Sequence, residues 1–173
     1  FDYTPKDCED FHRAAEEVCV PLSRTLDIQR KELLAVDPLR PWDLGVDVHG
    51  RDPLRPFEEV DEMVAGTSRM FHRISDELGT MFDSLRDGHS LDLDSRKGKA
   101  PGGYQIRFDR IRRPFIFMNA TGLQRDLETM VHEAGHAFHA MYSSKQDLID
   151  NRNPPIEFAE VASMSMELLV HPH

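Results

Sequence analysis

Apolar residues recur at helical spacing in two long stretches of the first half of the chain. In residues 7–36 and again in residues 56–86, an apolar residue returns every three or four positions, which predicts a helix in each. We expect Pro21 to kink or divide the first helix, because proline cannot donate a helical hydrogen bond. The two stripes consist of Phe11, Ala15, Val18, Leu22, Leu26, Leu33 and Leu34, and of Val60, Met63, Val64, Met70, Phe71, Ile74, Leu78 and Met81.

The spacing changes to alternation in residues 90–119. Tyr104, Ile106 and Phe108 are separated by polar residues, which predicts two or three antiparallel strands with a turn at residues 99–103. Prolines and glycines crowd residues 37–56, which predicts a loop with room for one short strand at residues 42–48.

Two further helical patterns occupy residues 123–144 and 155–170, on either side of a polar loop. In the first, we expect the buried face to consist of Leu127, Val131, Ala134, Phe138 and Met141. In the second, we expect it to consist of Phe158, Val161, Ala162, Ser165, Leu168 and Leu169. The predicted fold class is therefore mainly α with a small antiparallel β-sheet, in one domain over residues 1–173.

Composition and charge narrow the classes of partner. With 39% hydrophobic and 30% charged residues the chain resembles an ordinary globular protein, and no apolar run reaches the roughly 20 residues of a membrane span. The net charge of −10 argues against a nucleic-acid partner. The cluster of Arg107, Arg110, Arg112 and Arg113 is interrupted by Asp109 and is interpreted as a solvated strand face.

The cysteines and the chain ends suggest a compartment and a context. Cys8 and Cys19 lie on one predicted helix, about 16 Å apart along its axis. A disulfide requires Cα atoms within about 7 Å, so we expect free thiols and a cytoplasmic location. The chain opens at Phe1 and stops directly after a helical pattern, so we expect it to be a fragment of a longer protein.

Residues 132–136 carry the clearest chemical signal. They read His-Glu-Ala-Gly-His, the pattern H-E-x-x-H. On a helix, His132 and His136 project from one face and can bind one ion, while Glu133 can reach a water on that ion. The alternative is a helix without a metal site, whose histidines are merely hydrogen-bonded or exposed.

A catalytic zinc site requires a third protein ligand and an open position. A third histidine on the same segment would need Gly at 139 and His at 142, where this chain has His139 and Tyr142. A carboxylate from the following helix is the other solution, and the pattern leaves both Glu157 and Glu160 open.

Several segments together resemble the thimet oligopeptidase and oligoendopeptidase F family of zinc metallopeptidases. They are Leu39–Asp43, Asp94–Tyr104, Pro114–Asn119, Thr129–His139 and Glu157–Ser163. The resemblance implies a zincin-like metallopeptidase core of the gluzincin type, with one Zn²⁺ per chain held by His132, His136 and Glu160. It implies an endopeptidase for short peptides, in which Glu133 takes the proton of a water acidified by the metal.

Other residues have expected roles around this ligand set. Glu167 shares a helical face with Glu160 and is expected to accept the second N–H of a ligand histidine, unless it is simply solvated. His139 is expected near the metal without binding it. Gly102, Gly103 and Tyr104 are expected to bind the substrate backbone, or to form an ordinary turn. The family's transition-state Tyr and His residues come later than residue 173, so we expect the rest of the peptidase chain as a partner and little activity without it.

Two other classes of protein remain open from the sequence. A carboxylate-bridged di-iron protein would use the pairs Glu9–His12 and Glu133–His136 with Glu62 and Glu160, but it leaves His132 and the strands unexplained. A metal-stabilised interaction module without turnover is the non-enzymatic alternative. Metal content and a peptidase assay separate the three.

Overall fold

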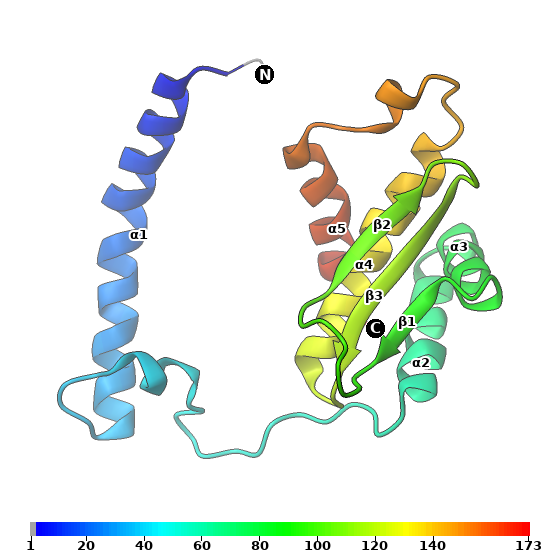
Figure 1. Cartoon of the computed structure of the whole chain (residues 1–173). Helices are drawn as coiled ribbons and strands as arrows, with labels where there is room; N and C mark the ends of the chain where they lie inside the picture. The colour runs from blue at the N-terminus through cyan, green and yellow to red at the C-terminus, as the bar shows by residue number, and fades with distance from the viewer. Residues whose placement is uncertain (1–2) are drawn as a thin grey trace. The chain divides into compact units, whose positions relative to one another are not determined.

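The computed structural model describes residues 3–173, which form two compact units divided between Asp52 and Pro53. The single domain expected over residues 1–173 stays a prediction. The elements in chain order are helix α1 (Pro5–Leu34), 3-10 helix η1 (Pro41–Gly45), helices α2 (Val60–Ile74) and α3 (Asp76–Asp87), strands β1 (Leu91–Asp94), β2 (Tyr104–Phe108) and β3 (Arg113–Ala120), helix α4 (Gln124–Ser143), 3-10 helix η2 (Ile149–Arg152) and helix α5 (Ile156–Val170) (Figure 1).

The first unit consists of α1 and the segment that follows it. Thr4 and Asp7 cap the helix reciprocally, since each side chain accepts the backbone N–H of the other residue. The helix is continuous past Pro21, so the predicted division there is wrong, and no residue of α1 is buried. The short strand predicted at residues 42–48 is also wrong. Pro41 begins η1 instead, and Asp43 caps it by accepting the N–H of Arg40 at 2.8 Å.

The second unit opens with two helices where the pattern predicted one over residues 56–86. The break is at Ser75, whose backbone is extended (φ −162°, ψ 132°) and whose hydroxyl accepts the N–H of Glu77 at 3.2 Å. Serine is a favoured residue at this capping position. The apolar stripe continues through the break, and Phe71 of α2 meets Phe82 of α3 with ring centroids 5.4 Å apart.

The three strands form a mixed sheet with the order β1-β3-β2. β2 pairs with β3 antiparallel, but β1 pairs with β3 parallel, so the predicted antiparallel sheet is wrong for β1. The reason is that residues 95–103 are a crossover rather than a hairpin turn, and β3 lies between the strands that they join (Figure 1). Alternate residues of β3, including Ile116 and Met118, are buried beneath the face that α4 covers.

Helices α4 and α5 lie within one residue of their predicted bounds. Val131, Ala134 and Phe138 of α4 are buried, as the pattern predicted. The predicted buried side of α5 is wrong, because its large apolar residues are exposed and only Ser163 is buried. Apolar residues lie on most sides of this helix, so their spacing did not single out the side that packs. The exposed ones include Phe158, Val161, Leu168 and Leu169.

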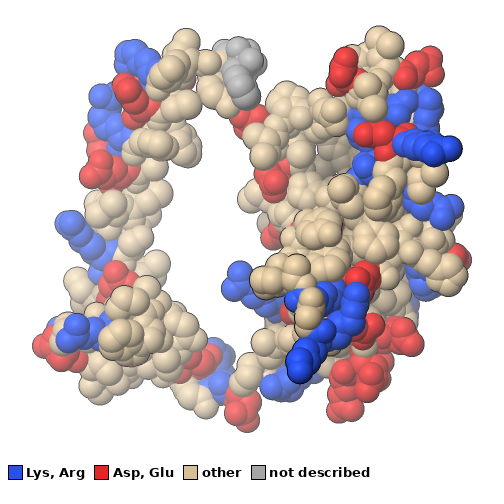
Figure 2. Space-filling model, in the orientation of Figure 1, with Lys and Arg blue, Asp and Glu red and all other residues tan. Residues whose placement is uncertain are grey.

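Within residues 3–173, no helix is both long enough and apolar enough to cross a membrane. On the visible face of residues 53–173, Lys and Arg are interspersed with Asp and Glu (Figure 2). Charged side chains of this unit form local ion pairs, such as Arg96 with Asp92 at 2.6 Å.

Candidate metal centre

The site is built where α4 and α5 approach each other closely. A Cβ atom added at Gly135 would lie 2.6 Å from the Cα of Ser163 and 2.8 Å from the carbonyl oxygen of Ala162. These distances are well inside van der Waals contact, so only glycine fits at this point of α4 without movement of α5. The close packing brings Glu160, from the first half of α5, beside the two histidines of α4.

His132, His136 and Glu160 place three potential ligand atoms in one small triangle. The Nε2 atoms of His132 and His136 are 3.2 Å apart. Oε2 of Glu160 lies 3.4 Å from Nε2 of His132, and its other oxygen, Oε1, lies 3.7 Å from Nε2 of His136. One ligand atom from each of the three residues lies within 4.8 Å of the other two. With zinc–ligand bonds of about 2.0–2.1 Å, the edge of a tetrahedron is about 3.3–3.4 Å long. The two imidazole nitrogens are close to that spacing, and a small rotation of the Glu160 carboxylate would complete three ligands of one tetrahedral ion, with a fourth position open.

The hydrogen bonds of the two rings favour metal binding. His132 donates its Nδ1–H to Glu167 at 2.6 Å, which is the contact that the sequence predicted for Glu167. The ring of His136 hydrogen-bonds to the backbone of Ala159, and burial lowers the pKa of His136 below its usual value, which favours the neutral ring. With Nδ1 of His132 directed at Glu167, its Nε2 faces Nε2 of His136, and a cation between the two nitrogens would be bound by both rings.

Glu133 stands beside this triangle and is not part of it. Its side chain is held at the interface of α4 with the sheet, where the residue is only 8% exposed. Burial raises the pKa of Glu133, against the opposing effects of His132 and of a hydrogen bond from the Gln105 backbone. A carboxyl group with a raised pKa exchanges protons more readily near neutral pH, as a general base must.

The glycine-rich segment reaches the same region from the sheet. Gly102 has a φ of +99° with open space around it, and a Cβ at Gly103 would lie 3.0 Å from the Thr129 side chain of α4. Tyr104 is half exposed and stacks on Phe117 at 4.9 Å. Since β2 is an edge strand, its outer backbone edge has no strand partner among the described residues.

The other expected residues have different positions. His139 is outside the triangle and lines a cavity of about 320 Å³ together with His136 and Gln105. Glu157 is exposed and also outside the triangle. Within the described residues, His132, His136 and Glu160 form the one group arranged to hold a metal. Glu62 instead accepts backbone N–H groups at the start of α2.

One residue of the basic cluster was interpreted wrongly. Arg107 is 11% exposed and does not lie on a solvated face. It faces α4 from β2, pairs with Asp109 at 2.6 Å, and donates to the carbonyl oxygen of Arg152 at 2.8 Å. In a strand, neighbouring residues face opposite sides, so the exposed Ile106 and Phe108 could have indicated that Arg107 faces inward. Arg107 thus ties β2 to the segment that leads into α5.

Known oligoendopeptidases are similar to this chain in sequence. The chain is 31% identical over 144 residues to an oligoendopeptidase F homolog of Mycoplasma pneumoniae, covering 83% of this chain and 23% of that protein. It is 28% identical over 153 residues to the oligopeptidase PepF of Bacillus subtilis, covering 87% of this chain and 22% of that protein. The chain therefore spans about a quarter of the length of these relatives.

Solved structures show the same arrangement of elements. A Bacillus anthracis protein described as an oligoendopeptidase F superposes with a TM-score of 0.92 at 30% identity, over 99% of this chain and 31% of that one. PZ peptidase A, solved with an inhibitor, gives a TM-score of 0.91 at 31% identity, over 99% of this chain and 30% of that one. The family model of peptidase family M3 matches residues 1–173. The chain belongs to peptidase family M3.

Proposed function

We propose that this chain is the zinc-binding catalytic core of an endopeptidase that hydrolyses short peptides. His132, His136 and Glu160 are the proposed zinc ligands, and Glu133 is the proposed general base. The observation that carries the proposal is the ligand triangle, in which the two Nε2 atoms are 3.2 Å apart and one ligand atom from each residue lies within 4.8 Å of the others. The names of the relatives, which are oligoendopeptidases, support the choice of reaction.

Residues around the metal have separate proposed roles. When bound, zinc supplies positive charge that polarises a peptide carbonyl and acidifies a water molecule. Glu133 takes the proton of the attacking water and later delivers it to the leaving amine. Glu167 fixes the ring of His132 through the hydrogen bond to Nδ1, which keeps Nε2 directed at the ligand position. His139 lines the adjacent cavity and is not one of the proposed metal ligands.

The substrate backbone is proposed to pair with the free edge of β2. Gly102 has open space around it where a peptide would approach that edge, Gly103 packs against Thr129, and Tyr104 lies at the start of the strand. Because the chain spans about a quarter of its relatives, we infer that the rest of the peptidase completes the substrate site and that this chain alone has little or no activity. Cys8 and Cys19 are exposed, unpaired thiols, which fits a reducing compartment such as the cytoplasm.

The test uses Glu133→Gln in a polypeptide extended to the length of the relatives, assayed on short fluorogenic peptides. We expect one zinc per chain in both proteins and a loss of turnover of about 10²- to 10⁴-fold in the variant. The matched control is Glu9→Gln, which removes a carboxylate that only the di-iron alternative needs. Unchanged turnover in Glu133→Gln would contradict the assigned base. Zinc binding with no turnover in the unmodified protein would favour the interaction module.

A further inference from the structure

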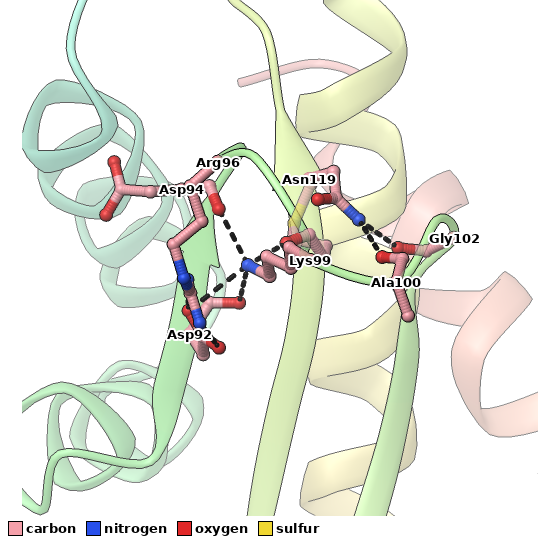
Figure 3. Close-up of polar contacts among 8 residues, drawn as sticks. Asp92, Asp94, Arg96, Lys99, Ala100, Gly102 and Asn119 are labelled. Carbon is pink, nitrogen blue, oxygen red and sulfur yellow. Dashed lines mark hydrogen bonds and ion pairs between the residues drawn. The ribbon is translucent and has the colours of Figure 1, made fainter.

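The crossover between β1 and β2 has to pass the end of β3. Since the sheet order is β1-β3-β2, residues 95–103 carry the chain from one edge of the sheet to the other. The crossover contains no regular element of its own. Two side chains, Lys99 and Asn119, connect it to the ends of the strands (Figure 3).

Lys99 lies inside the crossover, with its side chain only 1% exposed. Its ammonium donates to the carbonyl oxygens of Asp92 at 3.0 Å, of Asp94 at 2.7 Å and of Met118 (Figure 3). The Asp92 carboxylate, 3.1 Å away, balances its charge. These carbonyls belong to the ends of the parallel strands β1 and β3, where the register shifts between Asp92 and Asp94. Lys99 therefore joins the ends of both strands through their carbonyl oxygens.

Asn119 of β3 holds the other limb of the crossover. Its side-chain amide donates to the carbonyl oxygens of Ala100 at 2.9 Å and of Gly102 at 3.0 Å (Figure 3). The amide group of Asn119 thus binds two carbonyl oxygens within the three residues that precede Gly103. The point at which the chain enters β2 is fixed from β3.

The position of β2 matters for the candidate site. Gly103 packs directly against Thr129 of α4, and the backbone of Gln105 hydrogen-bonds to Glu133. Without the hydrogen bonds of Lys99 and Asn119, the first residues of β2 could move relative to Glu133. We propose that Lys99 and Asn119 are positioning residues for peptide hydrolysis, which hold the free edge of β2 in register with the general base. The inference rests on the proposed function and adds two residues that act on substrate alignment rather than on the metal.

The test compares Lys99→Met and Asn119→Ala with the unmodified protein, all extended to the length of the relatives. Each is assayed on a pair of matched peptides, one with free backbone amides and one N-methylated at an amide that pairs with β2. Methylation is expected to lower kcat/KM about tenfold in the unmodified protein, the equivalent of one or two hydrogen bonds. In both variants kcat/KM on the free peptide falls about tenfold, while the penalty for methylation shrinks to about twofold or less. Zinc content stays at one per chain.

Lys97→Met is the matched control, because it removes the same charge from an exposed position of the same crossover. It should behave like the unmodified protein. Asn119→Asp keeps the size of the side chain but replaces the donor, so it should behave like Asn119→Ala, and it carries the test if Lys99→Met does not fold. A methylation penalty that stays tenfold in the Asn119 variants would overturn the proposal. An unmodified protein that binds zinc but cleaves neither peptide would overturn the proposed function itself.

Discussion

Gly135 offers a sharp test of how the two metal-binding helices are held together. In Gly135→Ala the new Cβ would lie 2.6 Å from the Cα of Ser163 and 3.0 Å from the Cγ of Met166. Carbon atoms prefer separations of about 3.5–4.0 Å, so α5 has to move away by about 1 Å. The methionine side chain can turn aside, but the backbone of Ser163 cannot.

Two effects of opposite sign compete in this variant. Alanine is better than glycine in a helix by about 1 kcal/mol. Overpacking costs about 1–3 kcal/mol, so we expect unfolding free energy to fall by up to about 2 kcal/mol. Metal–ligand distances tolerate about 0.2 Å, and a 1 Å shift of the helix that carries Glu160 exceeds that limit. We therefore expect zinc affinity to fall about 10- to 100-fold, as when an outer partner of a ligand is lost.

The assay combines denaturant unfolding with zinc titration against a chromophoric chelator. The matched control is Gly66→Ala in α2, where the nearest atom to the added Cβ is the Arg69 guanidinium nitrogen at 3.8 Å. That variant should gain about 1 kcal/mol of stability and keep its zinc affinity. If Gly135→Ala matched Gly66→Ala in both measurements, the reasoning about the helix contact would be refuted.

Three further outcomes follow from the structure. Glu167→Gln should weaken zinc binding about 10- to 100-fold in the same titration, and equal affinity would show that the contact to His132 is incidental. Zinc at about 100 times its dissociation constant should raise unfolding free energy by about 2.7 kcal/mol, a gain that a chelator abolishes. Arg96 and Lys99 lower the pKa of Asp92 from 3.8 to about 2, so Asp92 stabilises the fold above pH 3.8 and loses that effect as the pH falls through about 2. Asp92→Asn should thus be less stable by about 2 kcal/mol at pH 7 and similar at pH 2, whereas a pH-independent difference would contradict the assignment.

The sequence was most informative where a short motif and a helical period coincide. The spacing of His132 and His136 predicts one shared face, and α4 has that face turned away from the buried Val131 and Phe138. Spacing alone did not choose between Glu157 and Glu160. The resemblance favoured Glu160, and the structure brings its carboxylate to the two rings.

The sequence was least informative where contacts between distant segments decide the outcome. The parallel pairing of β1 depends on a crossover whose anchors, Lys99 and Asn119, are polar residues in a turn-like stretch. The side of α5 that packs against α4 carries the small residue Ser163, because the close contact between the two helices there depends on Gly135 of α4. Periodicity within one segment carries no information about either contact.

The central claim is that one zinc ion is shared by α4 and α5, and anomalous diffraction at the zinc edge tests it most directly. Crystals grown with zinc should show one peak about 2.0–2.2 Å from Nε2 of His132, Nε2 of His136 and a carboxylate oxygen of Glu160. A zinc peak bound elsewhere in the chain, with these three side chains uncoordinated, would contradict the account.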